Sequence, residues 1–253
     1  MTDPRPLLSI IVPAYNEGAR LPTTLPQIAA FLLDQPYEAE VVVVDNNSSD
    51  NTDAIAQEFA GEFPFIRVLC EPVQGKGAAV RTGMLAAQGE FLFIADADLS
   101  MPIEEVNKFL PPILEGYDVA IASREAPGAV RYDEPEYRHL MGRIFNFIVR
   151  KLAVPGFQDT QAGFKCFRRS VAADLFSSQT LNGWAFDVEV LYLALKRGYD
   201  VVEVPIHWYY RESSRIHPIR DAISMVREVL RIRINDWQGR YGPPAVPAQP
   251  VKR

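Results

Sequence analysis

The sequence contains few of the residues that bind metals through sulfur or nitrogen. Its 253 residues include two cysteines, Cys70 and Cys166, and three histidines. The cysteines form neither a metal-type pair nor a disulfide framework, and the histidines lack metal-ligand spacing. We therefore expect two reduced thiols, as in a cytoplasmic protein.

Long apolar runs and an excess of positive charge are also absent. The longest apolar runs, such as residues 41–44, are far shorter than the ~20 residues that a membrane-spanning helix needs. Residues 1–6 show no signal-peptide pattern. The formal net charge is −6, so no overall basic field indicates a nucleic acid as partner.

Short apolar segments alternate with segments of helical periodicity over the first half of the chain. The predicted strands are 7–12, 40–44, 66–69, 89–95 and 119–122. The predicted helices are 21–33, 52–63 with Asp50 as N-cap, 77–87 and 103–114. This order predicts an α/β fold, with a mostly parallel central sheet and helices on both faces. Ligands of such sheets bind at the carboxyl ends of the strands, where this chain has polar clusters.

The second half is less regular. The pattern predicts loops at 127–135 and 157–165, and helices over 137–152, 185–196 and 219–237. It also predicts a strand over 201–204, which residues 206–210 could extend past Pro205.

Two carboxylates, Asp96 and Asp98, follow the strand predicted over 89–95. Side chains repeat every second residue along a strand, so both are expected on one side of it. Like charges at such a position are expected to share a hard divalent cation, Mg²⁺ or Mn²⁺. The alternative is a solvated turn in which Asp98 caps the next helix.

Three motifs of the first half, in this order, resemble the inverting glycosyltransferases of family 2. They are residues 13–17 (PAYNE), 44–52 (VDNNSSDNT) and 96–98 (DAD). The resemblance implies a GT-A fold, a Rossmann-like fold that binds a nucleotide sugar. Members of the family often have two carboxylates where this chain has Asp45 and Asn46, so a base contact at the second position stays open.

The resemblance also implies site residues on the donor side. Asp45 would read the base, and Asp98, with Asp96, would hold the metal on the diphosphate. The remaining residues implied for the nucleotide sugar are Pro13, Ala14, Tyr15, Glu17 and Ala97.

Residues 74–77 (QGKG) follow the third predicted strand and open a helix. Glycines there would let backbone N–H groups approach an anion, and the helix N-terminus would favour its charge. The segment is neither a Walker motif nor GxGxxG, which argues against an ATPase or a dehydrogenase. In the resembled family it lines the donor site, which places Lys76 there; a tight turn with a solvated lysine is the alternative.

Two motifs of the second half, 157–165 (FQDTQAGFK) and 184–189 (WAFDVE), narrow the resemblance. They are similar to the polyprenyl-phosphate sugar synthases, and most closely to the group that transfers glucose to dolichyl phosphate. The resemblance implies Trp184 and Asp187 near the sugar. Asp159 would orient a sugar hydroxyl or the acceptor, and base catalysis by it is a further alternative. Capping or an ion pair is the alternative for both carboxylates.

The implied reaction needs cations more than a base. A lipid phosphate is already anionic near neutral pH, so the enzyme must bring two anions together and stabilise the departing diphosphate. The catalytic candidates are Asp98, Asp159, Arg124 and Lys165. The candidates at the acceptor phosphate or diphosphate are Arg131, Gln161, Arg211, Ser214 and Arg215.

Two predicted helices, 138–152 and 219–237, have an apolar stripe beside basic residues. The stripes are Leu140, Ile144, Phe147 and Ile148 in the first helix, and Ile219, Ile223, Val226, Leu230 and Ile234 in the second. Such helices lie in a membrane interface or pack on a core, and both readings stay open.

The sequence thus predicts a metal-dependent inverting glucosyltransferase that uses UDP-glucose and a polyprenyl or dolichyl phosphate at the cytoplasmic face of a membrane. One domain is predicted over 1–240, with a nucleotide-sugar half (7–125), an acceptor half (126–216) and an amphipathic helix (217–238), before a disordered tail (241–253). The alternatives are a GDP-mannose-dependent enzyme, another acceptor, and a catalytically silent nucleotide-sugar-binding protein.

Overall fold

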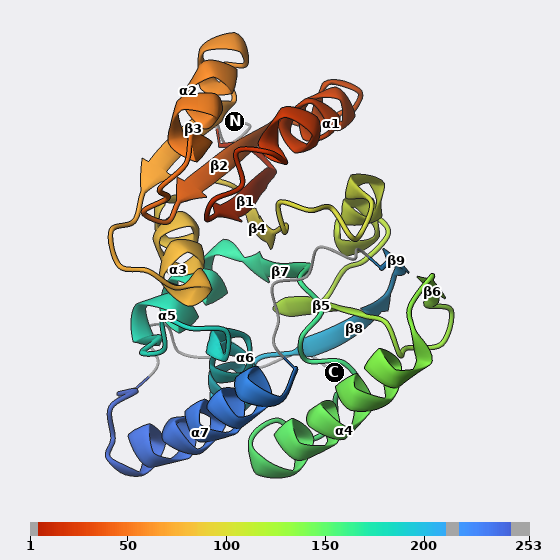
Figure 1. Cartoon of the computed structure of the whole chain (residues 1–253), viewed down its shortest axis with the longest axis vertical. Helices are drawn as coiled ribbons and strands as arrows, with labels where there is room; N and C mark the ends of the chain where they lie inside the picture. The colour runs from red at the N-terminus through yellow and green to blue at the C-terminus, as the bar shows by residue number, and fades with distance from the viewer. Residues whose placement is uncertain (1–4, 211–217, 244–253) are drawn as a thin grey trace.

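The central sheet joins the two halves of the sequence. The computed structural model describes residues 5–210 and 218–243. Figure 1 shows its seven-stranded sheet, whose order is β3-β2-β1-β4-β7-β5-β8; β6 and β9 form a second, two-stranded sheet. The strands are β1 (Leu8–Ala14), β2 (Ala39–Asp45), β3 (Ile66–Cys70), β4 (Phe91–Ile94), β5 (Val119–Ser123), β6 (Val130–Tyr132), β7 (Lys165–Arg168), β8 (Val201–Pro205) and β9 (His207–Tyr209).

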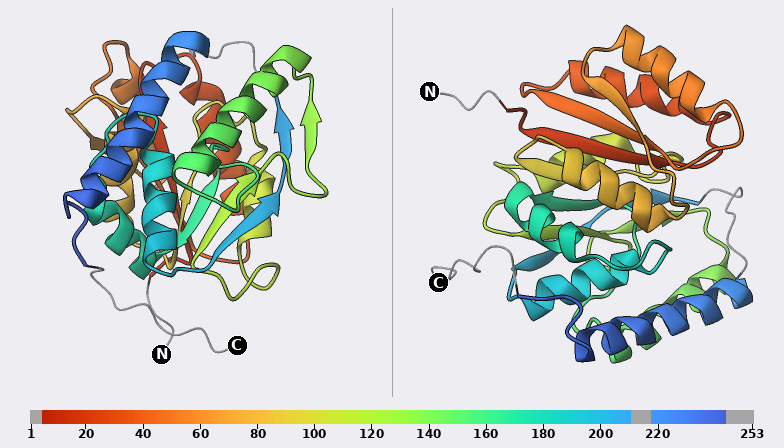
Figure 2. Two further views of the ribbon diagram at one scale, coloured as in Figure 1. Left: turned by 90° about the horizontal axis from the view of Figure 1, so that it is seen from below. Right: turned by 90° about the vertical axis from the view of Figure 1, so that its left-hand side faces the viewer.

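Helices cover both faces of the sheet (Figures 1 and 2). Helices α3, α5 and α6 pack on one face, and α1, α2 and the 3₁₀ helix η1 on the other. The helices are α1 (Leu21–Leu33), α2 (Thr52–Glu62), α3 (Lys76–Ala86), η1 (Ile103–Phe109), α4 (Glu136–Leu152), α5 (Arg169–Ser178), α6 (Phe186–Lys196) and α7 (Pro218–Trp237).

Alternate residues of the central strands enter two separate cores. In β2, Val42 and Val44 lie in the core under α3, α5 and α6, whereas Val41 and Val43 lie in the core under α1 and α2. Side chains alternate along a strand, so an uninterrupted valine run is buried on both faces. The predicted sheet with helices on both faces is confirmed.

Strand β7 brings the second half of the chain to the carboxyl edge of the first. It is antiparallel to β4 and β5, and Lys165 at its start pairs with Ile94 and Ile121 near the ends of those strands. The other strand pairs of this sheet are parallel. Residues 157–164 therefore lie at the same edge as the ends of β1, β2 and β4.

Some predicted elements differ in the structure. The predicted loop over 127–135 contains β6, which exists because it pairs with β9, far away in sequence. Strand β7 and helix α5 are not predicted, because β7 has four residues and α5 follows it without a turn. Residues 206–210 do continue past Pro205, but as β9 in the second sheet.

Two helix boundaries also differ. The helix predicted over 103–114 is wrong in type and length, since η1 is a 3₁₀ helix that ends at Phe109. Pro111 and Pro112 follow closely and have no N–H to continue a helical ladder. Asn51, and not Asp50, is the N-cap residue of α2, although Asp50 Oδ1 accepts a hydrogen bond from the Thr52 N–H (3.0 Å).

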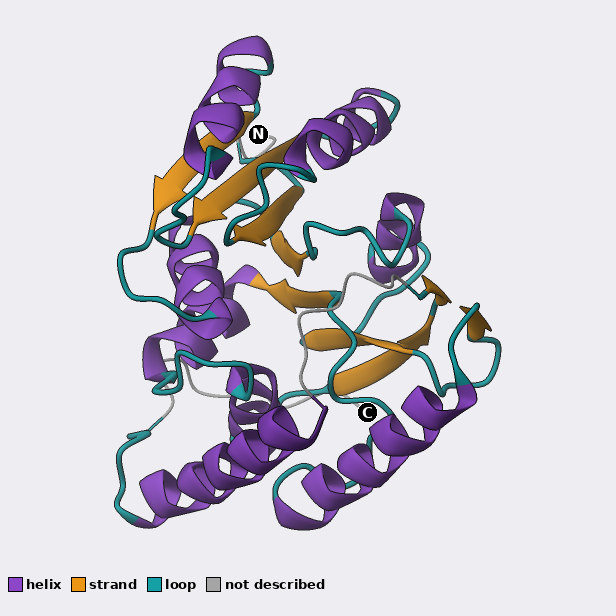
Figure 3. Ribbon diagram, viewed as in Figure 1, coloured by secondary structure: helices purple, strands orange, loops and turns teal. Residues whose placement is uncertain are grey.

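Helices α4 and α7 lie side by side on the outside of the fold (Figure 3). Val149 of α4 and Val229 and Ile232 of α7 are buried in the core that contains α6. No helix within the described ranges is long and apolar enough to cross a membrane. Tyr241, which the sequence assigns to a disordered tail, is buried; residues 244–253 of that tail lie outside the described residues.

Candidate active site

Asp45 has one side-chain oxygen that is buried at the carboxyl end of β2. It ends β2 beside Ala14, the last residue of β1. Its Oδ2 accepts a hydrogen bond from the Ser48 N–H (3.3 Å). Its Oδ1 is buried and has no hydrogen-bond partner among the described residues. An unsatisfied buried acceptor costs about 1–3 kcal/mol, so this oxygen is suited to accept a hydrogen bond from a ligand.

The segment after β1 lies at the same edge. Pro13 and Ala14 belong to β1, and the Tyr15 side chain that follows is 42% exposed. The Glu17 carboxylate accepts two hydrogen bonds from Arg20 (2.7 and 2.9 Å). The exposed Tyr15 ring can therefore contact a planar base, whereas Glu17 is already held in an ion pair.

Asn46 holds the loop between β3 and α3. Its buried side chain donates from Nδ2 to the carbonyl oxygens of Glu71 (3.1 Å) and Val73 (2.7 Å), and its Oδ1 accepts from the Gly75 N–H (2.7 Å). A carboxylate could donate neither of the first two bonds. The departure from the two-carboxylate pattern of the family therefore has a structural role.

The cation beside the two carboxylates of residues 96–98 is a lysine of the chain itself. Lys76 Nζ lies 2.6 Å from Asp96 Oδ1. Strand β4 ends at Ile94, so Asp96 and Asp98 lie in the turn beyond it, and the expectation that both project from a strand is wrong. Asp98 Oδ1 accepts a hydrogen bond from the Ser100 N–H (2.9 Å), which stabilises this turn.

Three acidic groups stabilise the charge of Lys76. Burial opposes the charged form, but Asp96, Asp187 and Asp98 outweigh burial and hold the pKa of the Lys76 ammonium above its usual value. The Trp184 ring centre lies 5.2 Å from Nζ, within cation–π range. Lys76 is thus a fixed positive charge beside the predicted metal ligands.

The glycines on either side of Lys76 are required by close packing. A Cβ on Gly75 would lie 2.2 Å from the Asn182 carbonyl oxygen, and a Cβ on Gly77 would lie 2.7 Å from that of Leu181. Gly75 also has φ +137°, which side-chain-bearing residues rarely adopt. The group that packs closely on these glycines is the main chain of the segment before α6.

Asp96 rests against Gly163 of the loop before β7. A Cβ on Gly163 would lie 2.0 Å from Asp96 Oδ2, so only glycine allows this contact. Within the described ranges, no group of three or more His, Cys, Asp or Glu side chains is placed to hold a metal ion. Asp96 and Asp98 do supply hard oxygen donors, and Asp96 already binds a cationic group, so the pair fits Mg²⁺ or Mn²⁺ with further ligands from a substrate.

A buried ion pair joins Lys165 to Asp187. The two charged groups are 3.0 Å apart, and Lys165 Nζ also donates to the Ala162 carbonyl oxygen (2.7 Å). Burial raises the pKa of Asp187, and the ammonium groups of Lys165 and Lys76 oppose that rise. The ion-pair alternative for Asp187 is thus present in this structure, with Lys165 as the partner.

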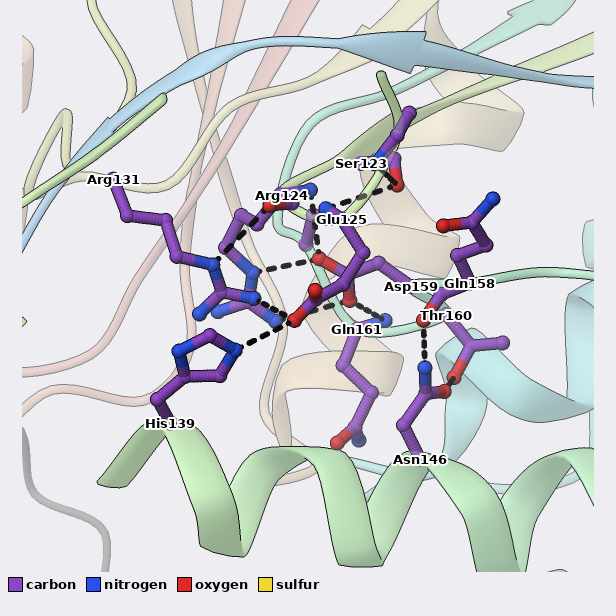
Figure 4. Close-up of polar contacts among 12 residues, drawn as sticks. Ser123, Arg124, Glu125, Arg131, His139, Asn146, Gln158, Asp159, Thr160 and Gln161 are labelled. Carbon is purple, nitrogen blue, oxygen red and sulfur yellow. Dashed lines mark hydrogen bonds and ion pairs between the residues drawn. The ribbon is translucent and has the colours of Figure 1, made fainter. Parts of the chain in front are cut away.

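Asp159 and Arg124 form a two-point ion pair (Figure 4). Asp159 Oδ2 accepts from Arg124 Nε (2.7 Å) and from the Arg124 N–H (3.1 Å), while Oδ1 accepts from Nη2 (3.0 Å) and from the Gln161 N–H (3.1 Å). Burial alone would raise the pKa of Asp159, but the guanidinium charge and these hydrogen bonds hold it well below its usual range. Asp159 is therefore ionised at neutral pH.

Neighbouring elements hold the Asp159 loop from two sides. From β8, the Glu203 carboxylate accepts hydrogen bonds from the N–H groups of Gln158 and Asp159 (3.0 Å each). From α4, the Asn146 side chain donates to the Gln158 carbonyl oxygen and accepts from the Thr160 hydroxyl (3.2 Å) (Figure 4). The position of Asp159 is therefore set by the tertiary structure.

Arg131 lines a pocket of about 430 Å³ next to Arg124. Its guanidinium group is shared between the carboxylates of Glu125 and Glu134. His139 Nε2 lies 3.2 Å from Glu125 Oε1 (Figure 4). The two arginines of the pocket thus already bind carboxylates. An acceptor phosphate would have to compete with those carboxylates.

The structure places most of the predicted site residues along one edge of the sheet. Lys76 lies with Asp96, Lys165 with Asp187, and Arg124 with Asp159. The predicted acceptor residues Arg211, Ser214 and Arg215 lie outside the described residues. The sequence marked Asn46 only as an open base contact, and it showed no sign of Asn146 or Glu203, because each of the three contacts a segment far from it along the chain.

Residues 9–176 match the family described as "Glycosyl transferase family 2". The chain belongs to this family. It is 36% identical over 250 residues to a dolichyl-phosphate beta-glucosyltransferase of Drosophila melanogaster, covering 92% of this chain and 76% of the relative. It is 33% identical to the enzyme of that name from Dictyostelium discoideum (89% and 73% covered) and 32% identical to that from Homo sapiens (94% and 78% covered).

Solved structures of the same fold are more distant in sequence. Glucosyl-3-phosphoglycerate synthase from Mycobacterium tuberculosis, solved with Mn²⁺, uridine diphosphate and phosphoglyceric acid, superposes with a TM-score of 0.62 at 20% identity. The match covers 94% of this chain and 80% of that one. The complex of that enzyme with Mn²⁺, UDP-glucose and phosphoglyceric acid gives a TM-score of 0.63 at 21% identity, with 94% and 81% covered. The GT-A fold that the motifs implied is confirmed, and the chain is a glycosyltransferase.

Proposed function

We propose that this glycosyltransferase transfers glucose from UDP-glucose to a polyprenyl phosphate of the dolichyl type, with inversion at the anomeric carbon. The observation that carries the proposal is the buried Asp45 Oδ1, which has no donor within residues 5–210 and 218–243 and lies at the edge where Lys76, Asp96 and Asp98 meet. A uracil ring has one N–H group, which can donate to that oxygen. The curated relatives supply the choice of glucose and of a lipid phosphate.

We propose that Asp96 and Asp98 would hold Mg²⁺ or Mn²⁺. The bound ion would neutralise the diphosphate as it leaves. The hard oxygen donors of the pair, and the ammonium group that Asp96 already binds, support this assignment. Lys76 carries a second positive charge to the same place, where it can contact a diphosphate oxygen.

The acceptor phosphate would lie near Arg124 and Arg131. These arginines line one pocket, and both end in guanidinium groups that suit a phosphate. Asp159 is ionised and fixed by Arg124, so its role in the proposal is to orient that arginine, and the phosphate attacks without a base. On sequence grounds, Gln161, Arg211, Ser214 and Arg215 remain proposed acceptor contacts.

We propose peripheral contact of α4 and α7 with the cytoplasmic face of a membrane. Val229 and Ile232 of α7 are buried, whereas Leu230, Ile234 and Trp237 are 45–85% exposed. The exposed residues are spaced four and three apart, so they share one face of the helix. Arg227, Arg231 and Arg233 are exposed on the same helix, as in helices that lie in a membrane interface.

The proposed function is tested by offering purified protein a panel of labelled nucleotide sugars with Mg²⁺ and polyprenyl phosphate. Label is expected in the organic phase from UDP-glucose and not from GDP-mannose. Label from GDP-mannose alone would make the enzyme a mannosyltransferase. Transfer to a water-soluble compound only, or no transfer at all, would overturn the lipid acceptor.

A further inference from the structure

The segment between α5 and α6, residues 179–185, lies between the donor site and α7. The match to the family description covers residues 9–176, so this segment follows the matched residues. It contains Trp184, whose ring lies 5.2 Å from Lys76 Nζ. We call it the 179–185 segment. Figure 2 shows α7 outside α6, on the side away from α3.

On the donor side, the 179–185 segment is bonded directly to the start of α3. Gln179 Nε2 donates to the Gly77 carbonyl oxygen (2.9 Å), and the Ala78 N–H donates to the Asn182 carbonyl oxygen (3.2 Å). Gly75 packs so closely on Asn182 that no side chain fits between them. A displacement of the segment would therefore move the first turn of α3, which begins with Lys76.

On the other side, the same segment is held by α7. The Glu228 carboxylate of α7 accepts a hydrogen bond from the Ala185 N–H (3.3 Å). A Cβ on Gly183 would lie 2.8 Å from Glu228 Oε1, so the carboxylate lies directly against the main chain on both sides of Trp184. About two helical turns further along α7, the buried Asn235 donates to the Thr180 hydroxyl (2.9 Å).

A buried carboxylate fixes the start of the segment. Glu189 of α6 is fully buried and accepts hydrogen bonds from the N–H groups of Thr180 (3.1 Å) and Leu181 (2.9 Å). It also accepts from the hydroxyl of Tyr241, four residues after the end of α7 (2.8 Å). Glu189 thus holds the start of the segment, whereas Glu228 contacts the residues on both sides of Trp184 at its end.

We infer that Glu228 of α7 is a positioning residue for the donor site, acting through the 179–185 segment on Trp184 and Lys76. Helix α7 then has two separate roles on two faces. Its exposed face serves the membrane contact proposed above, and its inner face completes the nucleotide-sugar site. The consequence for donor binding rests on the proposed function, whereas the contact between Glu228 and the segment does not.

The inference is tested with Glu228→Ala, which removes the acceptor of the Ala185 hydrogen bond. Loss of a hydrogen bond to a charged group corresponds to about a tenfold effect, so we expect the donor KM to rise about tenfold. The acceptor KM, kcat at saturating donor and vesicle sedimentation are expected to stay within twofold of the unsubstituted protein. Hydrogen exchange is expected to accelerate at residues 182–185.

Two variants serve as controls. Glu228→Gln keeps an acceptor oxygen and is expected to restore the donor KM to within about threefold of the original value. Glu58→Ala removes an exposed glutamate from α2 and is expected to change neither KM nor hydrogen exchange in the segment. Gly183→Ala adds a methyl group that would collide with the Glu228 carboxylate. This variant replaces Glu228→Ala in the test if Glu228→Ala does not fold.

The possible outcomes separate the two proposals. An unchanged donor KM together with unchanged exchange at 182–185 in Glu228→Ala would overturn the positioning role. An equal rise of donor and acceptor KM would also overturn it, since that result indicates a general structural defect. If the unsubstituted protein transfers nothing from UDP-glucose, the proposed function fails. Faster exchange in Glu228→Ala would still support the contact in that case.

Discussion

The two sides of the carboxyl edge differ in how their charged groups are partnered. On the β1–β2 side, one buried oxygen of Asp45 has no donor in the part of the chain that the structure describes. On the β5 side, Arg124 and Arg131 are each bound to carboxylates. Binding on the first side adds a hydrogen bond to a site that is already built. Binding of an anion on the second side must replace or share existing ion pairs.

This difference explains how one edge of the sheet can bind two anionic substrates. A nucleotide base is neutral and needs oriented hydrogen-bond partners, which a rigid strand end provides. A phosphate needs positive charge, but unpaired buried arginines are costly, so the structure neutralises them until a substrate arrives. Lys76 is paired with a carboxylate, like the two arginines. Its partner Asp96, however, is itself proposed to bind the metal.

The largest expected effect comes from Asp98→Ala. Loss of the charge that holds a metal on the leaving group is expected to lower kcat about a thousandfold, equal to about 4 kcal/mol. Circular dichroism should show an unchanged fold, because Asp98 is half-buried in the turn after β4 and lies outside the helices and strands. The measurement is transfer to polyprenyl phosphate at saturating Mg²⁺, and retention of most of the turnover would contradict the metal role.

The second-largest effect is expected from Asp159→Asn, which removes the ion pair with Arg124 on the β5 side. Removing the partner of a largely buried arginine is expected to lower the free energy of unfolding at pH 7 by about 3 kcal/mol. The folded pKa of Asp159 lies below its unfolded value, so its stabilisation is complete above about pH 4 and is lost as the pH falls further.

The difference between Asp159→Asn and the unsubstituted protein should therefore shrink below about pH 4, as measured by urea unfolding over a pH series. Asp53→Asn, at an exposed position of α2, is the control and is expected to cost less than about 1 kcal/mol. A constant difference down to the lowest pH would show that the charge of Asp159 is not the cause.

A smaller effect is expected from Gly163→Ala, which places a methyl group against Asp96. The ideal Cβ lies 2.0 Å from Oδ2, so the carboxylate or the loop must move. We expect Mn²⁺ affinity in the presence of UDP to fall about tenfold, or about 1.4 kcal/mol, as measured by calorimetry.

Gly142→Ala is the matched control for this variant. Its Cβ, on α4, would meet no atom within 4 Å. Alanine is a better helix former than glycine by about 0.5–1 kcal/mol, so this change should stabilise the protein and leave Mn²⁺ affinity unaltered. Equal affinity for the ion in the two alanine variants would remove the argument for close contact at Gly163.

The smallest expected effect is that of Asn46→Asp, which restores the two-carboxylate pattern of the family. The loss of two donors to the carbonyl oxygens of Glu71 and Val73 is expected to cost about 1 kcal/mol of unfolding free energy, since both oxygens can be partly hydrated. The measurement is urea unfolding with and without UDP. If the variant is more stable or binds UDP more tightly, Asn46 does not have the structural role assigned to it.

Much of the first half of the fold was predictable because the signals are local. The valine run of β2 and the polar residues directly after it predict both a buried strand and its ligand-facing end. The second half was less predictable. Strand β7 has four residues, and β6 is a strand only because β9 lies beside it. Such strands carry too few residues for a periodic pattern.

The sequence by itself determined the α/β class, the polar strand ends and the family, because these depend on neighbouring residues and their order. Which charges meet was set by the tertiary structure, since the pairs Lys76–Asp96, Arg124–Asp159 and Lys165–Asp187 each join two segments that are far apart along the chain. It also decided which face of α7 is buried. Helical spacing marks an apolar stripe, but burial depends on what packs against it, and here the core receives Val229 and Ile232 while Leu230 and Ile234 stay exposed.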